Sequence, residues 1–268
     1  AALPPGAGGG GAPVLLLHGF LGGLEDWGPV AEALAAVRDV HVADLPGHGG
    51  TPWPAAGLSF EGAAAAAAGL AAQLGGCAVV GYSLGARVAL GAALLAPPGD
   101  GAVLGCAAVS GTAGLPCGAE RGRRAARDDE LAAALASGGA EAFQGQWYAS
   151  PVWDSFRSHP AFAEAVARRA RASDPAGLAA ALSGLSTGRM PDLWPALAGC
   201  GVPLEVVAGA ADDKFAALGR RMAAQAPPGT ELTLVPGAGH AVHVEQPEAL
   251  AVALGRFLAS RVDGSRGA

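Results

Sequence analysis

Short apolar runs alternate with longer segments of helical spacing through most of the chain. The apolar runs lie at residues 13–20, 40–43, 77–83 and 102–110, and the helical segments between them lie at 29–37, 58–74 and 84–96. Runs that are apolar at consecutive positions are typical of strands buried on both faces of a sheet. Strands separated by helices of this length form βαβ units, so we predict a mostly parallel sheet flanked by helices.

The alternation stops after Ser110 and resumes near residue 203. Residues 119–186 are helical, charged and aromatic in pattern, and they contain no strand candidate. The later strands are predicted at 203–210 and 231–236, with helices near 214–226 and 247–260. We therefore predict an α/β core that is interrupted by a helical cap. The predicted units are a linker at 1–12, a core at 13–111 and 196–262, a cap at 112–195 and a tail at 263–268.

Composition narrows the classes of function. The 268 residues carry a formal net charge of −6, which argues against a nucleic-acid partner because phosphate binding requires clustered Lys and Arg. The longest weakly polar stretch, 62–81, contains Gln73 and falls short of a membrane span, so we expect no membrane partner. The four cysteines form no C-x-x-C pair and indicate a reducing compartment. The Gly-rich start resembles a linker, so we expect a domain of a larger polypeptide.

The pentapeptide GYSLG at residues 81–85 matches the motif G-x-S-x-G. It follows a predicted strand and opens a predicted helix, which is the context that this motif requires. A sharp turn there places the hydroxyl of Ser83 at the end of the sheet, and the flanking glycines let the backbone pass closely. The pentapeptide alone could also be an ordinary glycine-rich turn, so its interpretation depends on partners elsewhere in the chain.

A serine hydroxyl needs an imidazole to take its proton and a carboxylate to orient that imidazole. In the chain order of α/β-hydrolases both partners follow the serine, the acid after a late strand and the histidine after the last one. Asp212 and His240 occupy these places. Asp213 and His243 are the nearest competitors, and we interpret His243 as a supporting or helix-entry residue. We therefore predict an α/β-hydrolase fold with the catalytic triad Ser83, Asp212 and His240.

Two earlier loops carry further polar residues. Asp44 and His48 precede the serine in the chain, so we expect them to hold their own loop together rather than to serve the triad. For the side chain of His18 we expect a structural hydrogen bond. The backbone that follows His18 lies where such folds place one N–H of an oxyanion hole. We predict the N–H groups of Phe20 and Leu84 as the two donors to negative charge that develops in the transition state.

Arg87 lies one turn into the helix that follows Ser83, in an otherwise apolar segment. Burying a guanidinium is unfavourable unless an anion pairs with it, and that anion could be a fixed internal carboxylate or a substrate. The cap favours a substrate, because it carries arginine-rich segments at 120–135 and 168–175 and an aromatic cluster at 143–156. Arginine forks between aromatic walls suit a small molecule with several carboxylates. We therefore predict a small-molecule polycarboxylate as the partner of this site.

Seven motifs together resemble one family. They are HGFLGGLEDW, DLPGHG, GYSLGARVAL, ERGRRAARDDELA followed by QWYASPVW, LSTGRMPDLWPAL, ADDKF and GAGHAVHVEQP. In this combination the chain resembles the 2-succinyl-6-hydroxy-2,4-cyclohexadiene-1-carboxylate synthases of menaquinone and phylloquinone biosynthesis over about residues 13–258. The core motifs occur in many α/β-hydrolases, whereas W-Y-x-x-P-V-[FW], G-R-x-P-x-L and D-x-K-F are more specific.

The resemblance implies a lyase that uses no metal or organic cofactor. Such an enzyme removes pyruvate from 2-succinyl-5-enolpyruvyl-6-hydroxy-3-cyclohexene-1-carboxylate, with the serine of its triad acting as a base rather than forming an acyl-enzyme. The family's triad falls on Ser83, Asp212 and His240, and two of its substrate-binding arginines fall on Arg87 and Arg124. The family's pathway implies that the chain is fused to, or works beside, other enzymes of the same pathway. A bacterial cytoplasm is the expected location, with a plastid stroma as the alternative.

The resemblance also places pocket residues. Tyr82 and Trp147 match aromatic residues that line the family's pocket, and Trp153 stands where the family has a phenylalanine, so it is expected in the pocket wall. A further family arginine belongs among the three arginines of 168–171, and we favour Arg171. Two other functions stay open at this point. One is a carboxylesterase or carbon–carbon bond hydrolase that acts through an acyl-enzyme, and the other is a binding protein with a vestigial triad.

Overall fold

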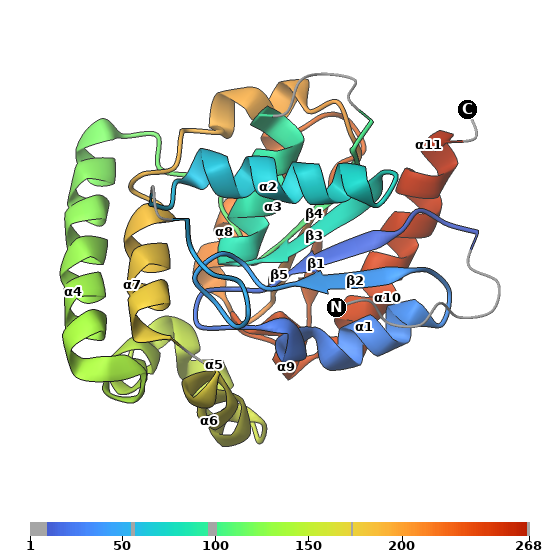
Figure 1. Cartoon of the computed structure of the whole chain (residues 1–268). Helices are drawn as coiled ribbons and strands as arrows, with labels where there is room; N and C mark the ends of the chain where they lie inside the picture. Colours follow the sequence, from blue (N-terminus) through green and yellow to red (C-terminus); the bar gives the residue numbers. More distant parts are fainter. Residues whose placement is uncertain (1–9, 55–56, 96–100, 173, 267–268) are drawn as a thin grey trace.

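The computed structural model describes residues 10–54, 57–95, 101–172 and 174–266, so most of the predicted linker at 1–12 lies outside the described residues. A six-stranded parallel sheet forms the core, in the order β2-β1-β3-β4-β5-β6 (Figure 1). The strands are β1 (Val14–Leu17), β2 (Val40–Ala43), β3 (Cys77–Tyr82), β4 (Val103–Val109), β5 (Leu204–Gly209) and β6 (Glu231–Val235). The prediction of a parallel sheet is confirmed.

Helices cover both faces of the sheet, which is why β3 and β5 are buried along their whole length. One face is covered by α2 (Phe60–Gln73), α3 (Leu84–Leu95) and α8 (Asp213–Gln225), and the other by α1 (Gly28–Ala35) and α10 (Pro247–Phe257) (Figure 1). Successive side chains of a strand point to opposite faces. Val79 of β3 therefore packs with the first helical layer and Val80 with the second.

The helical cap is inserted between β4 and β5. It consists of α4 (Gly118–Tyr148), the 3-10 turn η2 (Pro151–Trp153), α5 (Asp154–Arg157), α6 (Phe162–Arg171) and α7 (Pro175–Gly184). Helix α4 bends at Gly139, whose backbone lies at φ 81° and ψ 165°. The longest cap helix, α4, packs along α7 at one end of the core (Figure 1). A third apolar cluster joins cap to core around Leu21. This arrangement places the cap over the loops that follow the strands.

The C-terminal helix is longer than the sequence predicts. Helix α10 continues as a π-helix at Leu258–Asp263 and ends in α11 (Gly264–Arg266), where a tail was expected from residue 263. Val262 is fully buried, and the Asp263 carboxylate accepts a hydrogen bond from the Ala12 N–H at 2.8 Å. These contacts link the two ends of the described chain, so the extension depends on long-range packing rather than on local propensity.

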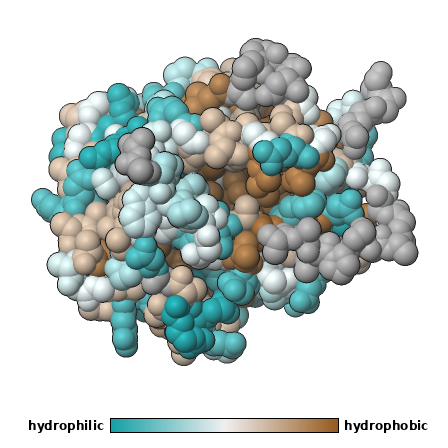
Figure 2. All heavy atoms as spheres, viewed as in Figure 1, coloured by the Kyte–Doolittle hydropathy of each residue, from teal (hydrophilic) through white to brown (hydrophobic). Residues whose placement is uncertain are grey.

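The molecular surface that faces the viewer in Figure 1 carries both hydrophilic and hydrophobic residues. Figure 2 shows hydrophilic side chains spread over the cap and the outer helices, while strongly hydrophobic residues gather between α2 and the β2 edge of the sheet. A surface hollow there is lined by Leu15, Val42, Leu70 and Leu74. Within the described ranges, no helix has both the length and the apolar character that crossing a bilayer requires.

Candidate active site

The turn between β3 and α3 holds Ser83 in a left-handed conformation with φ 51°. A Cβ at Gly81 would lie 2.0 Å from the carbonyl oxygen of Gly85, and a Cβ at Gly85 would lie 2.2 Å from the carbonyl oxygen of Leu17. Both separations are shorter than any side chain tolerates. The two glycines of G-x-S-x-G are therefore needed for backbone packing, and the strained serine between them presents its hydroxyl above the end of the sheet.

The structure brings Ser83, His240 and Asp212 together. His240 Nε2 lies 3.2 Å from Ser83 Oγ, and His240 Nδ1 lies 2.8 Å from Asp212 Oδ2. The Asp212 carboxylate also accepts a hydrogen bond from the Phe215 N–H at 3.1 Å, because Asp212 caps α8. Its neighbour Asp213 is exposed. The order hydroxyl, imidazole and carboxylate matches the arrangement that activates a serine.

His243, the competing histidine, lies beneath this group and is fully buried. Its ring packs against Tyr82 with centroids 4.0 Å apart, and burial lowers the pKa of His243 to about 3. Tyr82 packs between His243 and His240, on the side of the sheet that faces α1. Tyr82 therefore supports His240 from below and does not line the cavity above Ser83, which corrects its predicted position in the pocket. Side chains of a strand alternate, and the last residue of β3 points away from the cap.

The polar residues of the earlier loops have local partners. The Leu45 N–H donates to His18 Nε2 at 2.9 Å, and His18 Nδ1 lies 2.7 Å from the carbonyl oxygen of Gly19. The Asp44 carboxylate accepts from the N–H groups of Leu24 and Gly50, both at 3.0 Å. These bonds tie the loop after β1 to the loop after β2. The buried His48 packs against His18, and burial lowers the pKa of His48 to about 3.

The predicted oxyanion donors lie on the loop after β1, which carries Phe20, and at the start of α3, which carries Leu84. Phe20 and Leu84 both line the cavity beside Ser83. Within the described residues, neither backbone N–H donates a hydrogen bond to another group. Leu84 is the first residue of α3, where the N–H groups of a helix have no intrahelical acceptor. Two N–H groups next to a serine hydroxyl, without internal acceptors, suit an oxygen atom that gains negative charge.

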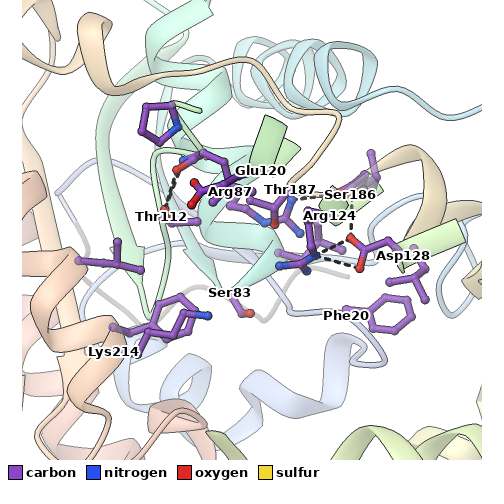
Figure 3. Close-up of a pocket in the computed structure, with 18 of the residues that line it drawn as sticks. Phe20, Ser83, Arg87, Thr112, Glu120, Arg124, Asp128, Ser186, Thr187 and Lys214 are labelled. Carbon is purple, nitrogen blue, oxygen red and sulfur yellow. Dashed lines mark hydrogen bonds and ion pairs between the residues drawn. The ribbon is translucent and has the colours of Figure 1, made fainter. Parts of the chain in front are cut away.

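A cavity with two lobes opens on either side of Ser83. The lobe toward α3 has a volume of about 330 Å³, and the lobe toward η2 has a volume of about 270 Å³. Both lobes are lined by Ser83, Arg124, Asp128, Trp147, Lys214 and Phe215. Figure 3 shows Arg87, Arg124 and Lys214 around the space next to Ser83, with Phe20 on the side opposite Lys214. The combined space suits a small molecule.

Arg87 reaches the first lobe from α3. Its Nη1 donates to the carbonyl oxygen of Leu185 at 2.6 Å, and it forms no ion pair with any described carboxylate. Burial, with a smaller contribution from the nearby Arg124, lowers the pKa of Arg87 to about 9. The fixed internal carboxylate that could have explained this arginine is therefore absent from the described part of the chain. The guanidinium is left facing a cavity.

Arg124 is held differently. Its Nε donates to both carboxylate oxygens of Asp128, at 2.8 and 2.9 Å. Asp128 is 2% exposed and also accepts from the Ser186 hydroxyl at 2.6 Å. This bifurcated hydrogen bond fixes the guanidinium where it faces both lobes, and its remaining N–H groups stay available for a ligand.

Lys214 lines both lobes and was not singled out as a site residue by the sequence reasoning. It forms no ion pair among the residues described, and burial followed by the neighbouring Arg124 lowers its pKa. Lys214 is the only lysine in the sequence, and it stands two residues after Asp212 in the specific motif D-x-K-F. Those two signals could have identified it.

Two further arginines line single lobes. Arg221 lines the first lobe with its guanidinium 3.8 Å from the centroid of the Trp194 ring, and Arg127 lines the second. Arg127 follows Arg124 by three positions in α4, so the two side chains share one helix face. Cations therefore outnumber carboxylates around the cavity, since its lining acids among the described residues are Asp128 and Glu120. The field in the cavity favours an anion.

Aromatic side chains form the cap side of the cavity. Trp147 lines both lobes and meets Phe20 edge-on, with ring centroids 5.0 Å apart. Trp153 lines the second lobe, and its ring lies edge-on to His240 with centroids 5.0 Å apart. The structure thus brings both predicted cap aromatics to the site.

The arginines of 168–171 do not line the cavity. Arg168 Nη2 lies 2.7 Å from Asp26 Oδ1, and Arg169 is buried against the same carboxylate. Arg169 also donates to the hydroxyl of Tyr148 at 2.8 Å. Arg171 is exposed on the outside of the cap, which corrects its predicted role. Residues two apart on a helix point about 200° apart, so Arg169 and Arg171 face opposite directions.

Comparisons with known proteins identify the family of this chain. A family model described as the alpha/beta hydrolase family matches residues 14–253. The 2-succinyl-6-hydroxy-2,4-cyclohexadiene-1-carboxylate synthase of Escherichia fergusonii is 34% identical over 250 residues, which cover 91% of this chain and 93% of that protein. The chain belongs to this synthase family. The predicted family, the α/β-hydrolase fold and the assignment as a lyase of that fold are thereby confirmed.

Two further proteins are similar to this chain over most of its length. The structure of MenH from S. aureus superposes with a TM-score of 0.88 at 26% identity and covers 97% of both chains. Protein PHYLLO, chloroplastic, of Arabidopsis thaliana is 35% identical over 272 residues, which cover 95% of this chain but only 16% of that protein. This chain therefore matches both a protein of its own length and one part of a much longer polypeptide.

Proposed function

We propose that this chain eliminates pyruvate from 2-succinyl-5-enolpyruvyl-6-hydroxy-3-cyclohexene-1-carboxylate, within menaquinone or phylloquinone biosynthesis. The product is 2-succinyl-6-hydroxy-2,4-cyclohexadiene-1-carboxylate. The observation that carries the proposal is the guanidinium of Arg87, which lies half-buried beside Ser83 without an ion pair to any described residue. The substrate has three carboxylates, on the ring, the succinyl group and the enolpyruvyl group. They supply anions for Arg87, Arg124 and Lys214.

In the proposed step Ser83 acts as the base. His240 Nε2 takes the proton of Ser83 Oγ, and the Asp212 carboxylate stabilises the imidazolium that forms. Ser83 Oγ then takes the proton from ring carbon 2, which bears the succinyl carbonyl. The electron pair of that C–H bond forms the 2,3 double bond, the 3,4 double bond moves to 4,5, and the bond from carbon 5 to the enolpyruvyl oxygen breaks. His240 returns its proton to the departing enolpyruvate, which becomes pyruvate.

Negative charge accumulates on the succinyl carbonyl oxygen when the ring proton leaves. The N–H groups of Phe20 and Leu84 lie beside Ser83 without acceptors among the described residues, so they can stabilise that oxygen. The cations at the cavity hold the carboxylates and thereby present ring carbon 2 to Ser83. The aromatic rings of Trp147 and Trp153 form the apolar walls on the cap side.

A hydrolase with an acyl-enzyme would use the same triad and the same oxyanion donors. It predicts a burst of product from an activated ester and stable acylation of Ser83. It does not account for four cations that face the cavity without a carboxylate partner among the described residues, namely Arg87, Arg127, Lys214 and Arg221. A binding protein without catalysis does not account for a hydroxyl, an imidazole and a carboxylate that are all within hydrogen-bonding distance.

The assay that tests the proposal couples this protein to the preceding enzyme of the pathway, which supplies the substrate. The pyruvate released is measured by the NADH that an added dehydrogenase consumes in reducing it. We expect pyruvate release at a rate proportional to the concentration of this protein and well above the uncatalysed rate. Pyruvate release at the uncatalysed rate, together with a burst from an activated ester, would instead establish the hydrolase.

The proposal extends to the setting of the reaction. The likeness to part of PHYLLO supports a protein that is fused to, or works beside, other enzymes of its pathway. The bacterial relatives and the chloroplastic one support either a bacterial cytoplasm or a plastid stroma. Both are reducing, in keeping with four free cysteines.

Replacing Lys214 by arginine tests its contact with a carboxylate. Because burial and the neighbouring Arg124 lower its pKa, Lys214 loses its charge at a lower pH than an ordinary lysine does. We therefore expect KM for the substrate to rise about tenfold as the pH rises through that pKa, since one charge-assisted hydrogen bond is lost. The guanidinium introduced in the K214R variant stays charged, so its KM should rise less than that of the wild type across the same alkaline range, and the rise that remains is due to Arg87, whose pKa is lowered to about 9. Equal KM profiles for the two proteins would contradict the contact.

A further inference from the structure

The carboxylate of Glu245 is bonded to the backbone on both sides of His240. Its Oε2 accepts from the Gly239 N–H and its Oε1 from the Ala241 N–H, both at 2.9 Å. Glu245 ends the short helix α9 (Val242–Glu245) and is 3% exposed. A glutamate is rarely buried unless it is paired, and no cation is paired with this one in the part of the chain that the structure describes. Both of its carboxylate oxygens instead accept hydrogen bonds from the loop that carries His240.

The cap reaches the same carboxylate. The hydroxyl of Ser155, in α5, donates a hydrogen bond to Glu245 Oε2. A Cβ at Gly239 would lie 2.6 Å from the Cβ of Ser155, so the histidine loop and α5 are in direct contact. Two residues earlier, the ring of Trp153 packs edge-on to the imidazole of His240. The cap therefore touches His240 through an aromatic ring and touches its backbone support through a hydroxyl.

We propose that Glu245 is a positioning residue for His240, and that Ser155 makes this support depend on the seating of the cap. His240 must reach Ser83 on one element and Asp212 on another, at 3.2 and 2.8 Å. Fixing the amides before and after a residue restrains its backbone dihedrals and hence the direction of its side chain. An imidazole displaced by a fraction of an ångström would pair poorly with Ser83, and catalysis is sensitive to such displacements. This inference rests on the proposed function of His240.

The test replaces Glu245 by glutamine, which has the same shape but keeps only one acceptor oxygen. One of the two backbone amides then faces an NH₂ group and loses its acceptor. We expect kcat for pyruvate release to fall about thirtyfold while KM stays within about twofold, because no substrate contact is removed. The matched control is Glu248→Gln, an exposed glutamate in the first turn of α10, which should leave both constants unchanged.

A second readout separates positioning from the overall reaction and from mere loss of stability. A fluorophosphonate ester forms a bond from Ser83 Oγ to phosphorus with loss of fluoride, while His240 takes the serine proton. When circular dichroism shows that E245Q is folded, its Ser83 should be phosphonylated about thirtyfold more slowly than that of the wild type. If the wild type is labelled but releases no pyruvate, the proposed function fails while the labelling rates still decide the role of Glu245. Wild-type kcat and wild-type labelling in folded E245Q would overturn the proposal.

Ser155→Ala provides the test of the cap contact and remains usable if E245Q does not fold. This change removes one donor and leaves both amide bonds of Glu245 in place, so we expect about a threefold loss in kcat and in labelling rate. In the double variant E245Q/S155A the two losses should not multiply, because both changes act through one carboxylate. Unchanged rates in S155A would overturn the dependence on the cap. Losses that multiply in the double variant would overturn the proposal that both residues act through the carboxylate of Glu245.

Discussion

Replacing Ser83 by alanine is expected to lower kcat for pyruvate release by about 10⁴-fold, with KM within about threefold of the wild type. The hydroxyl is the proposed base, and removal of one member of a triad costs catalysis on this scale. The substrate contacts belong to Arg87, Arg124 and Lys214, so binding should persist. The measurement is the coupled pyruvate assay under steady-state conditions.

Ser110→Ala is the matched control for that result. Ser110 follows β4 as Ser83 follows β3, is 1% exposed and has φ 49°, close to the φ 51° of Ser83. Its hydroxyl has no partner among the described groups and does not line the cavity, so its loss should leave kcat unchanged. A Ser83→Ala protein that keeps a tenth or more of the wild-type turnover would rule out the serine as the base.

Replacing Arg87 by methionine is expected to lower kcat/KM by about 10³-fold. Methionine has a similar length but no charge, so a carboxylate of the substrate would be left without its partner in a buried site. Loss of one partner from a buried charge pair costs about 4 kcal/mol, which corresponds to this factor. The same assay over a range of substrate concentrations gives kcat/KM, and the remaining hydroxyl, imidazole and carboxylate should leave slow turnover.

Arg121→Met serves as the control for the backbone contact of Arg87. Arg121, in α4, also donates from its guanidinium to backbone carbonyl groups, those of Leu115 at 2.8 Å and Pro116 at 3.1 Å. It does not line either lobe, so its replacement should change kcat/KM by less than about twofold. If Arg87→Met has an equally small effect, Arg87 does not bind the substrate, and the elimination loses the observation on which it was proposed.

The core of the fold could be predicted because its determinants are local. Consecutive apolar residues in β3 and β5 indicate strands that are covered on both faces, and the intervening helical spacing requires crossovers to a parallel neighbour. The extension of the C-terminal helix to Arg266 could not be predicted. It depends on Val262 inside the core and on Asp263 bonded to the start of the described chain, and both partners are remote in sequence.

The site residues likewise divide into those that local sequence identifies and those whose position depends on remote contacts. Ser83 was identified by the glycines on either side of it, and Asp212 and His240 by their positions after late strands, which all meet at one edge of a parallel sheet. The cap residues that face the cavity were harder to predict from the sequence. Spacing along α6 fixes which arginines share a helix face but not which face meets the cavity. That choice is made by Asp26, which follows β1 and draws Arg168 and Arg169 toward itself.

The sequence by itself determined the alternation of strands and helices, the turn at Ser83 and the order of the three residues around it. Each depends on side-chain periodicity or on backbone geometry within a few residues. Only the tertiary structure decided that Lys214 faces the cavity, that Tyr82 lies beneath His240 and that Arg171 points outward. The physical reason is that the orientation of a cap helix, or of a side chain at the end of a strand, relative to a cavity is fixed by packing between segments far apart in the chain.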